Sequence, residues 1–495
     1  MVVNFNTLFP MSFIEGHNWL GILPLLCMTL TAVFTLVLAP LKQVGRALSF
    51  AMLLIGSLAA VASIAVFPFS ETIVMLDGVL VFDRLSQVFS AVLVLAGLAA
   101  AVMTMGYDER EHFQTEFFSL IAFAVVGMMG MVSTRNIVFF FIALELMSLT
   151  VYILVAMHRQ SPMSAEASLK YFLLGGAASA VMLYGASILY GTTGSLDATV
   201  IGSTFQTLWS NGIPILPMVG MALFSIGFLF KIGAFPFHVW VPDVYTGAAT
   251  PITGFMISAV KAAATGALLR MSLDLFAYPV AKEPVLVGVL GFIIFATLMF
   301  GSIVGLRQTR LKRIFAYSTI VHTGYVLLGF LALLSGGAGA KDASSAIVSY
   351  TIYYVVMNLG AFAVLTMISP KDDDDLTLDH LTGLGARRPL LAFAMSVFLL
   401  SMAGIPPTAG FLGKYYLFSA ALASGFTGMT IIAAIASVLS AVIYLRPMVH
   451  MYMKESDEAF QAVPSNWFGS NLIVGLSLFL TVVMGLVPAW FSRLL

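Results

Sequence analysis

Apolar runs separated by short polar intervals follow one another along the whole chain. Because a helix satisfies its own backbone hydrogen bonds, it is the element expected wherever such a run lies in hydrocarbon. Fourteen runs approach the ~20 residues that span a bilayer. The pattern therefore predicts an all-α polytopic membrane protein with about fourteen transmembrane helices, near residues 20–39, 48–67, 86–105, 117–133, 137–156, 171–190, 214–236, 252–273, 285–305, 314–334, 346–368, 390–420 with a break, 429–450 and 471–491.

Composition supports the membrane class and excludes several others. Hydrophobic residues make up 60% of the 495 and charged residues 9%, whereas about a quarter of a soluble domain is charged. The formal net charge is zero, which argues against nucleic acid as a partner. The single cysteine, Cys27, excludes an internal disulfide or a cysteine-ligated cluster. Glycine-rich nucleotide loops, CxxC pairs and HExxH patterns are missing, so we expect no cofactor or metal bound by this chain alone.

Basic residues divide unevenly between the two sets of connecting segments. Fourteen, with Lys312 and Arg313 among them, follow odd-numbered helices, and six, with Arg270 and Lys282 among them, lie on the opposite side. Cytoplasmic connections carry the excess of lysine and arginine. An even number of helices puts both termini on one side, so both are expected outside the cytoplasm.

Three lysines fall inside apolar runs, where a charge costs about 2.5–3.5 kcal/mol unless it faces protein or water. Lys231 lies in "FSIGFLFKIGAFPFHVW", where Pro236 should break the helix just after the lysine. Lys414 lies in "LSMAGIPPTAGFLGKYYLF", where the break at Pro406 and Pro407 comes before the lysine. Broken helices at membrane depth line polar cavities. The third lysine, Lys261, lies in "GFMISAVKAAATGALL".

The two broken helices are the seventh and the twelfth, so they cross the membrane in opposite directions. This spacing predicts an inverted repeat of two five-helix units, each with a discontinuous third helix. We expect three helices in residues 1–110, the first repeat (helices four to eight) in 111–280, the second (helices nine to thirteen) in 281–455, and a final helix in 456–495.

The same offset pairs Glu145 of helix five with His322 of helix ten. With the three lysines they form a series of ionisable groups, as a proton path requires. Lysine suits such a path because its ammonium can lose its proton on burial, whereas arginine keeps its charge. We therefore predict a relay in which Glu145 is the electrostatic partner of Lys231. In the alternative interpretation, a lysine snorkels from a helix end and His322 bonds a backbone carbonyl.

The remaining charges are interpreted as peripheral. We expect Lys282, Arg270 and the run Asp372 to Asp375 to be surface charges with no part in transport, although the acidic run could also bind a cation. His238 and Asp243, in "PFHVWVPDVYTGAATP", are expected to have a structural or entrance role at the cytoplasmic mouth.

Four stretches carry a resemblance that covers helices four to thirteen: "FKIGAFPFHVWVPDVYTGAATPI", "EASLKYFLLGGAASA", "LKRIFAYSTIVHTGY" and "SMAGIPPTAGFLGKYYLF". They resemble the antiporter-like membrane subunits of respiratory complex I, the proton-translocating NADH:quinone oxidoreductase, and most of all its subunit N group. "PDVYTGAATP" is the sharper marker, since the broken-helix lysines specify only a superfamily shared with Mrp-type cation/proton antiporters.

The resemblance implies a proton relay made of Glu145, Lys231, Lys261, His322 and Lys414. It also implies that NADH, FMN, iron–sulphur clusters and quinone are held by other subunits, and that the partners are other membrane subunits of complex I, neighbouring antiporter-like subunits included. Because three helices precede the repeat, a bacterial plasma (inner) membrane with periplasmic termini is favoured over a mitochondrial inner membrane.

Two alternatives stay open. An independent Mrp-type antiporter would use the same lysines to exchange sodium or potassium for protons without a redox partner. A non-transporting scaffold would use the buried charges only to fix helix register and subunit docking.

Overall fold

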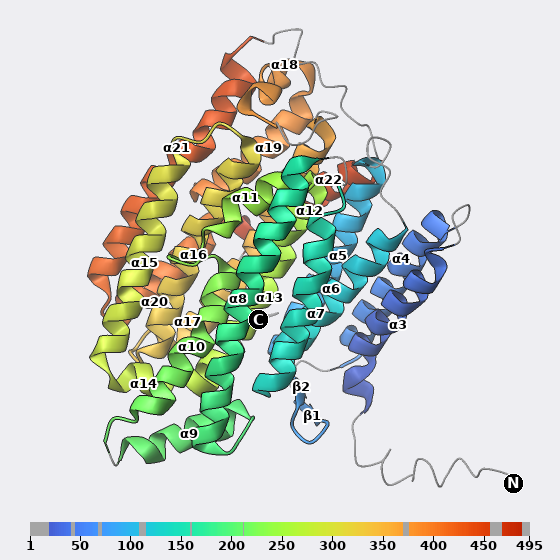
Figure 1. Cartoon of the computed structure of the whole chain (residues 1–495). Coiled ribbons are helices and arrows are strands. Elements are labelled where there is room, and N and C mark those ends of the chain that lie inside the picture. Colours follow the sequence, from blue (N-terminus) through green and yellow to red (C-terminus); the bar gives the residue numbers. More distant parts are fainter. Residues whose placement is uncertain are drawn as a thin grey trace, which may run out of the picture.

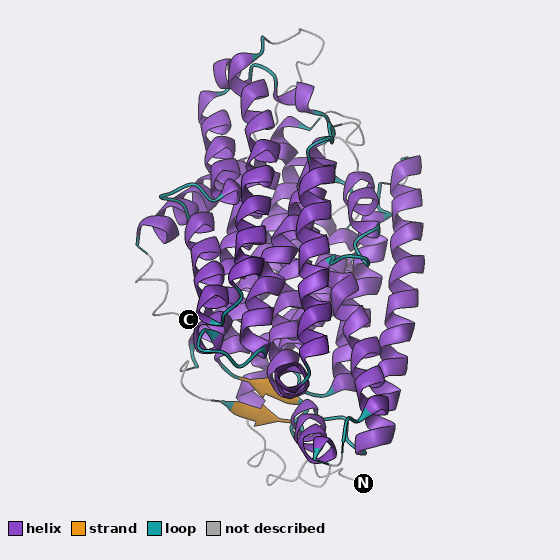
Figure 2. Ribbon diagram, turned by 90° about the vertical axis from the view of Figure 1, so that its left-hand side faces the viewer, coloured by secondary structure: helices purple, strands orange, loops and turns teal. Residues whose placement is uncertain are grey.

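The computed structural model describes residues 19–40, 45–67, 72–107, 115–158, 161–210, 212–369, 376–455 and 468–487. The run Asp372 to Asp375 lies outside these residues. The described chain is one bundle of long, roughly aligned helices with a small β-hairpin at one end (Figure 1 and Figure 2).

The first part of the chain supplies three long helices and the hairpin. In the hairpin, Ile73 faces Phe82 and Met75 faces Leu80 in an antiparallel pair. The elements are η1 (Trp19–Ile22), α3 (Leu23–Leu38), α4 (Gly45–Ala65), β1 (Ile73–Met75), β2 (Leu80–Phe82) and α5 (Arg84–Tyr107).

The middle of the chain contains the first broken helix and a long helix with two π-helical turns. Its elements are α6 (Glu116–Val132), α7 (Ile137–Val155), α8 (Pro162–Thr193), α9 (Ala198–Trp209), α10 (Ile215–Ile232), α11 (Trp240–Gly247), α12 (Thr250–Phe255), η2 (Met256–Val260), α13 (Lys261–Met271), η3 (Ser272–Phe276) and α14 (Ala277–Lys282). The segments η2 and η3 are π-helical, and turns of this kind are frequent at functional sites. Lys261 directly follows η2.

The last part of the chain contains the second broken helix. Its elements are α15 (Pro284–Gly305), α16 (Leu311–Leu334), α17 (Ala340–Ile368), η5 (Leu378–Leu381), α18 (Leu384–Arg387), α19 (Pro389–Ala403), α20 (Ala409–Ala423), α21 (Thr427–Met453) and α22 (Phe468–Leu486).

The predicted class, an all-α polytopic membrane protein, is confirmed. Eleven described helices are long and apolar enough to cross a membrane, and α3, α6 and α19 are shorter apolar helices. Each of the fourteen predicted runs overlaps one or more described helices. The number of crossings, the inverted repeat and the four divisions of the chain stay predictions.

Both predicted helix breaks are confirmed. The first helix, α10, ends at Ile232 and continues as α11 at Trp240, with Gly233 in the left-handed conformation at φ 72°. The second, α19, ends at Ala403, Gly404 has φ 87°, and α20 begins at Ala409. A positive φ favours glycine because it has no Cβ to clash. The two breaks therefore lie after Lys231 and before Lys414, in the reversed order that the sequence predicted.

Burial separates central from peripheral helices. The most apolar windows of α16 and of the helix from Thr250 to Lys282 are wholly buried, and that of α17 is 94% buried. Peripheral helices such as α15 expose large apolar side chains, among them Val285 and Phe292, as lipid-facing helices do. Lys261 and His322 therefore lie on the two most enclosed helices.

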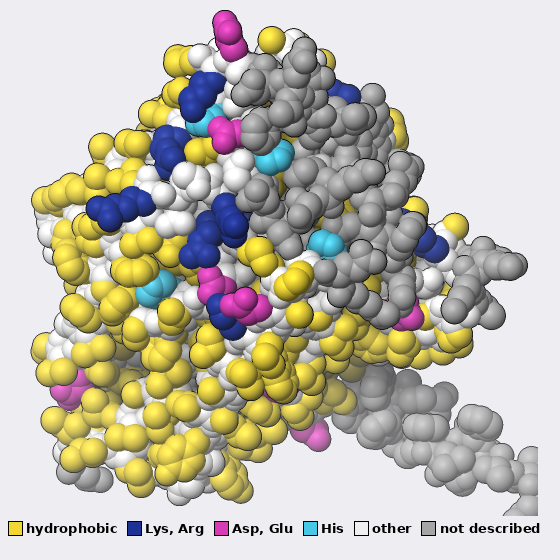
Figure 3. Space-filling model, turned by 45° about the horizontal axis from the view of Figure 1, so that its top comes forward, with side chains coloured by type: hydrophobic (Ala, Val, Ile, Leu, Met, Phe, Trp, Pro, Cys, Tyr) yellow, Lys and Arg dark blue, Asp and Glu magenta, His cyan; other side chains and the backbone are white. Residues whose placement is uncertain are grey.

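Charge gathers at one end of the bundle. Figure 3 shows Lys and Arg side chains together on the end that comes forward, above a mostly apolar flank. This end carries α18, with Arg387, and the end of α21, followed by Lys454. It contains connections that the sequence predicts to be cytoplasmic.

Candidate functional site

Lys231 lies at the end of α10 inside a cage of aromatic rings. Its side chain is 4% exposed, and Nζ lies 5.3 Å from the ring centre of Tyr152, 5.1 Å from Tyr171 and 5.6 Å from Phe230. No described residue accepts a hydrogen bond from Nζ. Ring faces attract a cation through their quadrupole, so aromatic faces are the principal close partners of this ammonium.

Glu145 lies on α7 and does not bond directly to Lys231. Its Oε1 accepts a hydrogen bond of 2.5 Å from Ser179 Oγ of α8. Its carboxylate still interacts electrostatically with Lys231 and with the hydroxyl of Tyr171. This interaction is not an ion pair, and the partnership of Glu145 with Lys231 in a relay stays a prediction.

Lys261 directs its ammonium toward α16. Its Nζ donates to the carbonyl oxygen of Thr319 at 2.5 Å and lies 5.0 Å from the ring centre of Tyr354. The hydroxyls of Thr319 and Tyr354 are hydrogen-bonded to each other at 2.8 Å. Lys261 is therefore connected to the polar side chains between α16 and α17.

His322 lies on α16 between two tyrosine hydroxyls. Its Nδ1 is hydrogen-bonded to Tyr350 of α17 and its Nε2 to Tyr444 of α21 at 2.9 Å. Tyr444 in turn bonds Ser318 at 2.6 Å. Because both ring nitrogens contact hydroxyls, which can donate or accept, the imidazole can exchange a proton on either side. The alternative, a histidine that only bonds a carbonyl, is wrong.

Lys414 lies on α20 beside the second break. Its Nζ donates to the carbonyl oxygen of Ala403 at 2.8 Å and to Ser437 Oγ at 2.9 Å. The ring centre of Tyr325 lies 4.9 Å away. Ala403 is the last residue of α19, so the break itself supplies an acceptor to the lysine.

The aromatic side chains around His322 bring these groups into one row. Its ring centre lies 4.9 Å from that of Tyr354, beside Lys261, and 5.7 Å from that of Tyr325, beside Lys414. Toward the first half, Thr323 Oγ1 donates at 2.6 Å to the carbonyl oxygen of Ile232, the residue after Lys231. Three of the five predicted residues, Lys261, His322 and Lys414, thus lie along one buried polar axis through α13, α16 and α20. Lys231 adjoins this axis only through the backbone of the residue that follows it, and Glu145 is bonded to Ser179 instead.

Ring residues around the lysines were missed by sequence reasoning. Tyr152 and Tyr171 are buried, and their hydroxyls have no partner among the described residues. The hydroxyl of Tyr152 lies so close to Gly175 that a Cβ there would meet it at 2.0 Å. One available signal was the spacing of Glu145 and Tyr152, because residues seven apart share a helix face.

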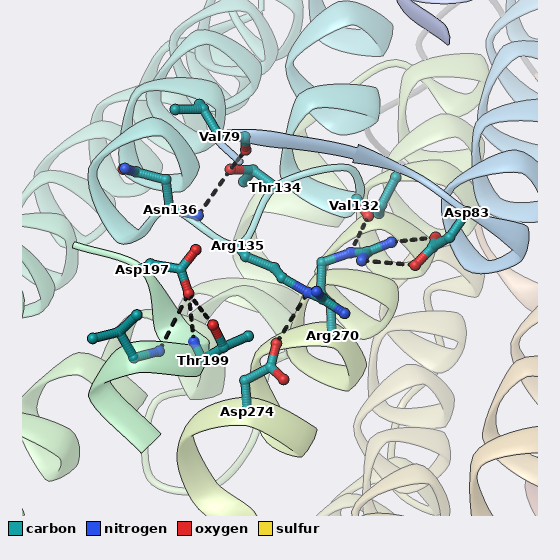
Figure 4. A network of polar contacts seen from close by, with 11 residues as sticks. Val79, Asp83, Val132, Thr134, Arg135, Asn136, Asp197, Thr199, Arg270 and Asp274 are labelled. Carbon is teal, nitrogen blue, oxygen red and sulfur yellow. Dashed lines mark hydrogen bonds and ion pairs between the residues drawn. The ribbon is translucent and has the colours of Figure 1, made fainter. Parts of the chain in front are cut away.

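Arg270 is not a surface charge, contrary to the prediction. It is 3% exposed, donates to both carboxylate oxygens of Asp83 at 2.6 and 3.0 Å, and donates through Nε to the carbonyl oxygen of Val132 (Figure 4). Burial raises the pKa of Asp83, but the hydrogen bonds and charge of Arg270 outweigh this and lower it overall. The helix was expected to end near residue 273, yet it continues to Lys282 and places Arg270 inside the bundle.

Lys312 also departs from its predicted place in a connection. It is 1% exposed and donates to the carbonyl oxygens of Thr246 and Ala248, at 3.2 and 2.9 Å. These carbonyls lie at the end of α11. The first turn of α16 thus holds the segment that follows the first break.

The other charges lie closer to expectation. Lys282 is exposed, as predicted. Asp243 forms ion pairs with Lys170 at 2.8 Å and Arg313 at 2.9 Å. His238 is buried against the ring of Phe300, at 4.5 Å between ring centres. Among the described residues, no group of three or more His, Cys, Asp or Glu side chains could hold a metal ion.

Comparison with known proteins places this chain in a family of membrane proteins. A family model described as NADH:quinone oxidoreductase/Mrp antiporter, TM, matches residues 133–443. The chain is 39% identical over 425 residues to NADH-quinone oxidoreductase subunit N of Trichlorobacter lovleyi, covering 86% of this chain and 84% of the relative. It is 38% identical over 418 residues to NADH-quinone oxidoreductase subunit N 1 of Sorangium cellulosum, covering 83% and 81%.

Solved structures give the same result at the level of the fold. A chain of respiratory complex I from Thermus thermophilus with bound aureothin superposes with a TM-score of 0.79 at 32% identity, covering 95% of this chain and 98% of that chain. A chain of the Mrp complex from Dietzia superposes with a TM-score of 0.82 at 21% identity, covering 96% of each. The latter identity supports likeness of fold alone.

Proposed function

The chain belongs to the NADH:quinone oxidoreductase/Mrp antiporter family of membrane proteins, and from that premise we propose that it moves protons as a membrane subunit of respiratory complex I. It is an antiporter-like subunit of the complex I type. The relay consists of Glu145, Lys231, Lys261, His322 and Lys414.

The observation that carries this proposal is the buried axis of exchangeable groups. Lys261, His322 and Lys414 are connected through hydroxyls and ring contacts in the buried interior of the bundle. A change of charge at one member alters the field at its neighbours, because charges interact strongly where water is excluded. A proton gained at one lysine thus favours release from the next.

The rest of the complex would supply the driving force. NADH, FMN, iron–sulphur clusters and quinone are proposed to lie in other subunits, and oxidation of NADH there would change the charge that this axis experiences. Neighbouring membrane subunits, further antiporter-like chains included, would flank the bundle. The proposed location is a bacterial plasma membrane with both termini periplasmic.

An Mrp-type antiporter is the second candidate, and the observation in its favour is that the matching family model covers Mrp antiporters as well as NADH:quinone oxidoreductase. The identity of 38–39% to subunit N relatives favours complex I instead. The two differ in their need for a redox partner and for a metal cation.

The test is proton translocation by the complete complex in sealed vesicles. We expect a pH difference across the vesicle membrane that depends on NADH and quinone. This difference should be unchanged when sodium and potassium are replaced by choline. Exchange of sodium or potassium for protons by vesicles that contain this chain alone would overturn the proposal in favour of an antiporter. Normal proton pumping in an assembled complex in which Lys231, Lys261 and Lys414 are replaced by alanine would instead support the non-transporting scaffold.

A further inference from the structure

A second charged cluster lies away from the proton axis, at the end of the bundle that carries the hairpin. It surrounds a cavity of about 250 Å³. Three arginines, two aspartates and two serines line it together with apolar side chains; the lining residues are Arg84, Arg135, Arg270, Asp83, Asp274, Ser344, Ser345, Leu85, Val88, Leu269, Leu273 and Val348. Its lining therefore offers both charged groups and apolar surface to a ligand.

The cavity lies where three apolar helices end together. Arg84 begins α5, Ser344 and Ser345 lie in the first turns of α17, and Leu273 and Asp274 belong to η3 near the end of the helix from Thr250 to Lys282. All three helices are candidate membrane spans. Charged ends beside apolar turns place the cavity at the depth where lipid headgroups meet acyl chains.

The two arginines in Figure 4 differ in how far they are satisfied. Arg270 uses Nε on Val132 and both terminal nitrogens on Asp83. Arg135 is partly exposed and meets Asp274 through Nε at 3.4 Å, without the geometry of a hydrogen bond. A guanidinium has five N–H donors, and its fork matches the oxygens of a phosphate. Arg135 thus has donors to offer a ligand in the cavity.

We propose that this cavity binds the headgroup of a membrane phospholipid. The phosphate would accept hydrogen bonds from Arg135, and the ammonium of phosphatidylethanolamine would lie against the carboxylate of Asp274. The first acyl carbons would pack on Leu269 and Leu273. Leu273 lines the cavity and is 51% exposed, so an acyl chain that packs on it could continue along the outside of the bundle.

Photochemical cross-linking in the assembled complex tests the site. The probe is a phosphatidylethanolamine with a diazirine on the first acyl carbons, added in vesicles, and the adducts are mapped by peptide mass spectrometry. We expect adducts on Leu269, Leu273 or Val348. Arg135→Gln should lower their yield about tenfold, the size expected for loss of a charge-assisted phosphate contact. Lys282→Gln removes a charge at the same end outside the cavity and should leave the yield unchanged.

Further arms identify the ligand. Asp274→Asn should weaken labelling by phosphatidylethanolamine more than by a phosphatidylglycerol probe, because only the former has an ammonium. Competition by unlabelled phospholipid but not by inorganic phosphate supports the proposal. Equal competition by inorganic phosphate would assign the cavity to a free anion. Disulfide or reagent cross-linking of a Leu273→Cys variant to a neighbouring subunit would assign it to a protein contact. Either result overturns the lipid site.

Discussion

Arg270 and Lys231 both carry a basic group inside the bundle, but their partners differ. Arg270 holds a carboxylate with two hydrogen bonds and a carbonyl with a third. Lys231 has three aromatic rings and no hydrogen-bond partner among the described residues. The first arrangement fixes a charge in place. The second leaves the ammonium free to lose its proton without breaking a bond to the protein.

Chemistry and location agree with this difference. Guanidinium stays protonated at any physiological pH, whereas an ammonium in a desolvated site exchanges its proton. Arg270 joins the ends of α5, α6 and α13 through its hydrogen bonds to Asp83 and Val132. Lys231 lies next to a helix break and adjoins the buried axis. A buried cation is therefore assigned a structural or a relay role by its partners rather than by its depth alone.

The largest expected effect concerns the structural cation. Asp83→Asn leaves the guanidinium of Arg270 buried without a counter-charge, and removal of one partner from such a pair costs about 3–5 kcal/mol. We expect a marked fall in the thermal midpoint of the assembled complex. The measurement is thermal unfolding of the purified complex, with Lys282→Gln as a control that changes the net charge by one, in the opposite direction, at an exposed site.

A paired replacement sharpens this prediction. Asp83→Leu combined with Arg270→Met removes both charges, and apolar replacement of a buried pair is often close to neutral. The double variant should recover much of the lost stability and pump protons normally once assembled. If it is as unstable as Asp83→Asn, the pair does more than compensate a buried charge.

The next effect concerns Lys231, the proposed relay cation. Lys231→Arg keeps the positive charge but cannot release a proton, so we expect proton translocation to fall roughly 10²-fold or more, as when a general acid–base group is lost. Lys231→Ala should have a similar effect. The measurement is protons pumped per NADH oxidised in reconstituted vesicles, with an assembly check on the native complex. Wild-type pumping by an assembled Lys231→Arg complex would show that Lys231 is structural, like Arg270.

The sequence predicted the lysine sites better than it predicted the role of Arg270. Gly233 with Pro236, and Gly404 with Pro406 and Pro407, break helices for local steric reasons, which need no knowledge of the neighbours. The helices that carry Lys231 and Lys414 could therefore be described from single segments.

Arg270 was misassigned because the residues that surround it are brought together only by tertiary packing. Hydropathy ends the apolar run near residue 273, but packing extends the helix to Lys282 and brings Asp83, 187 residues away, against the guanidinium. The ring cage was missed for the same reason. Tyr171 and Phe230 meet Lys231 only through the contact of α8 with α10, and an aromatic residue in an apolar run is not distinguished from ordinary packing by its sequence.

The third prediction concerns the cage itself. Tyr171→Leu removes a ring face from Lys231, and a desolvated cation–π contact contributes up to ~2 kcal/mol, so pumping should fall roughly threefold to tenfold. Tyr171→Phe keeps the ring and loses a hydroxyl that has no partner among the described residues, so it should retain pumping. The pH profile of pumping is measured for both, because a shift with Leu but not with Phe separates an effect on the ammonium from a packing defect. If Tyr171→Phe abolishes pumping while the pH profile of Tyr171→Leu is unshifted, the hydroxyl of Tyr171 belongs to the relay instead.

The smallest expected effect is the pH dependence of the Asp83 pair. Asp83 lies before α5, and its pKa in the folded chain is lower than the ordinary value because Arg270 outweighs the effect of burial. A lowered pKa means that the folded state favours the charged carboxylate. The stabilisation is therefore fully present above the unfolded pKa of ~3.9 and is lost as the pH falls through the folded value.

Other carboxylates titrate in the same range, so the informative quantity is the difference in thermal midpoint between the wild type and Asp83→Asn. This difference should be constant from neutral pH down to about pH 5 and should shrink below about pH 4. A difference that stays constant throughout the acid range would mean that Asp83 stabilises the bundle as a neutral hydrogen-bonding group. Asp83 and Arg270 would then not form the fixed ion pair with which the exchangeable ammonium of Lys231 is contrasted.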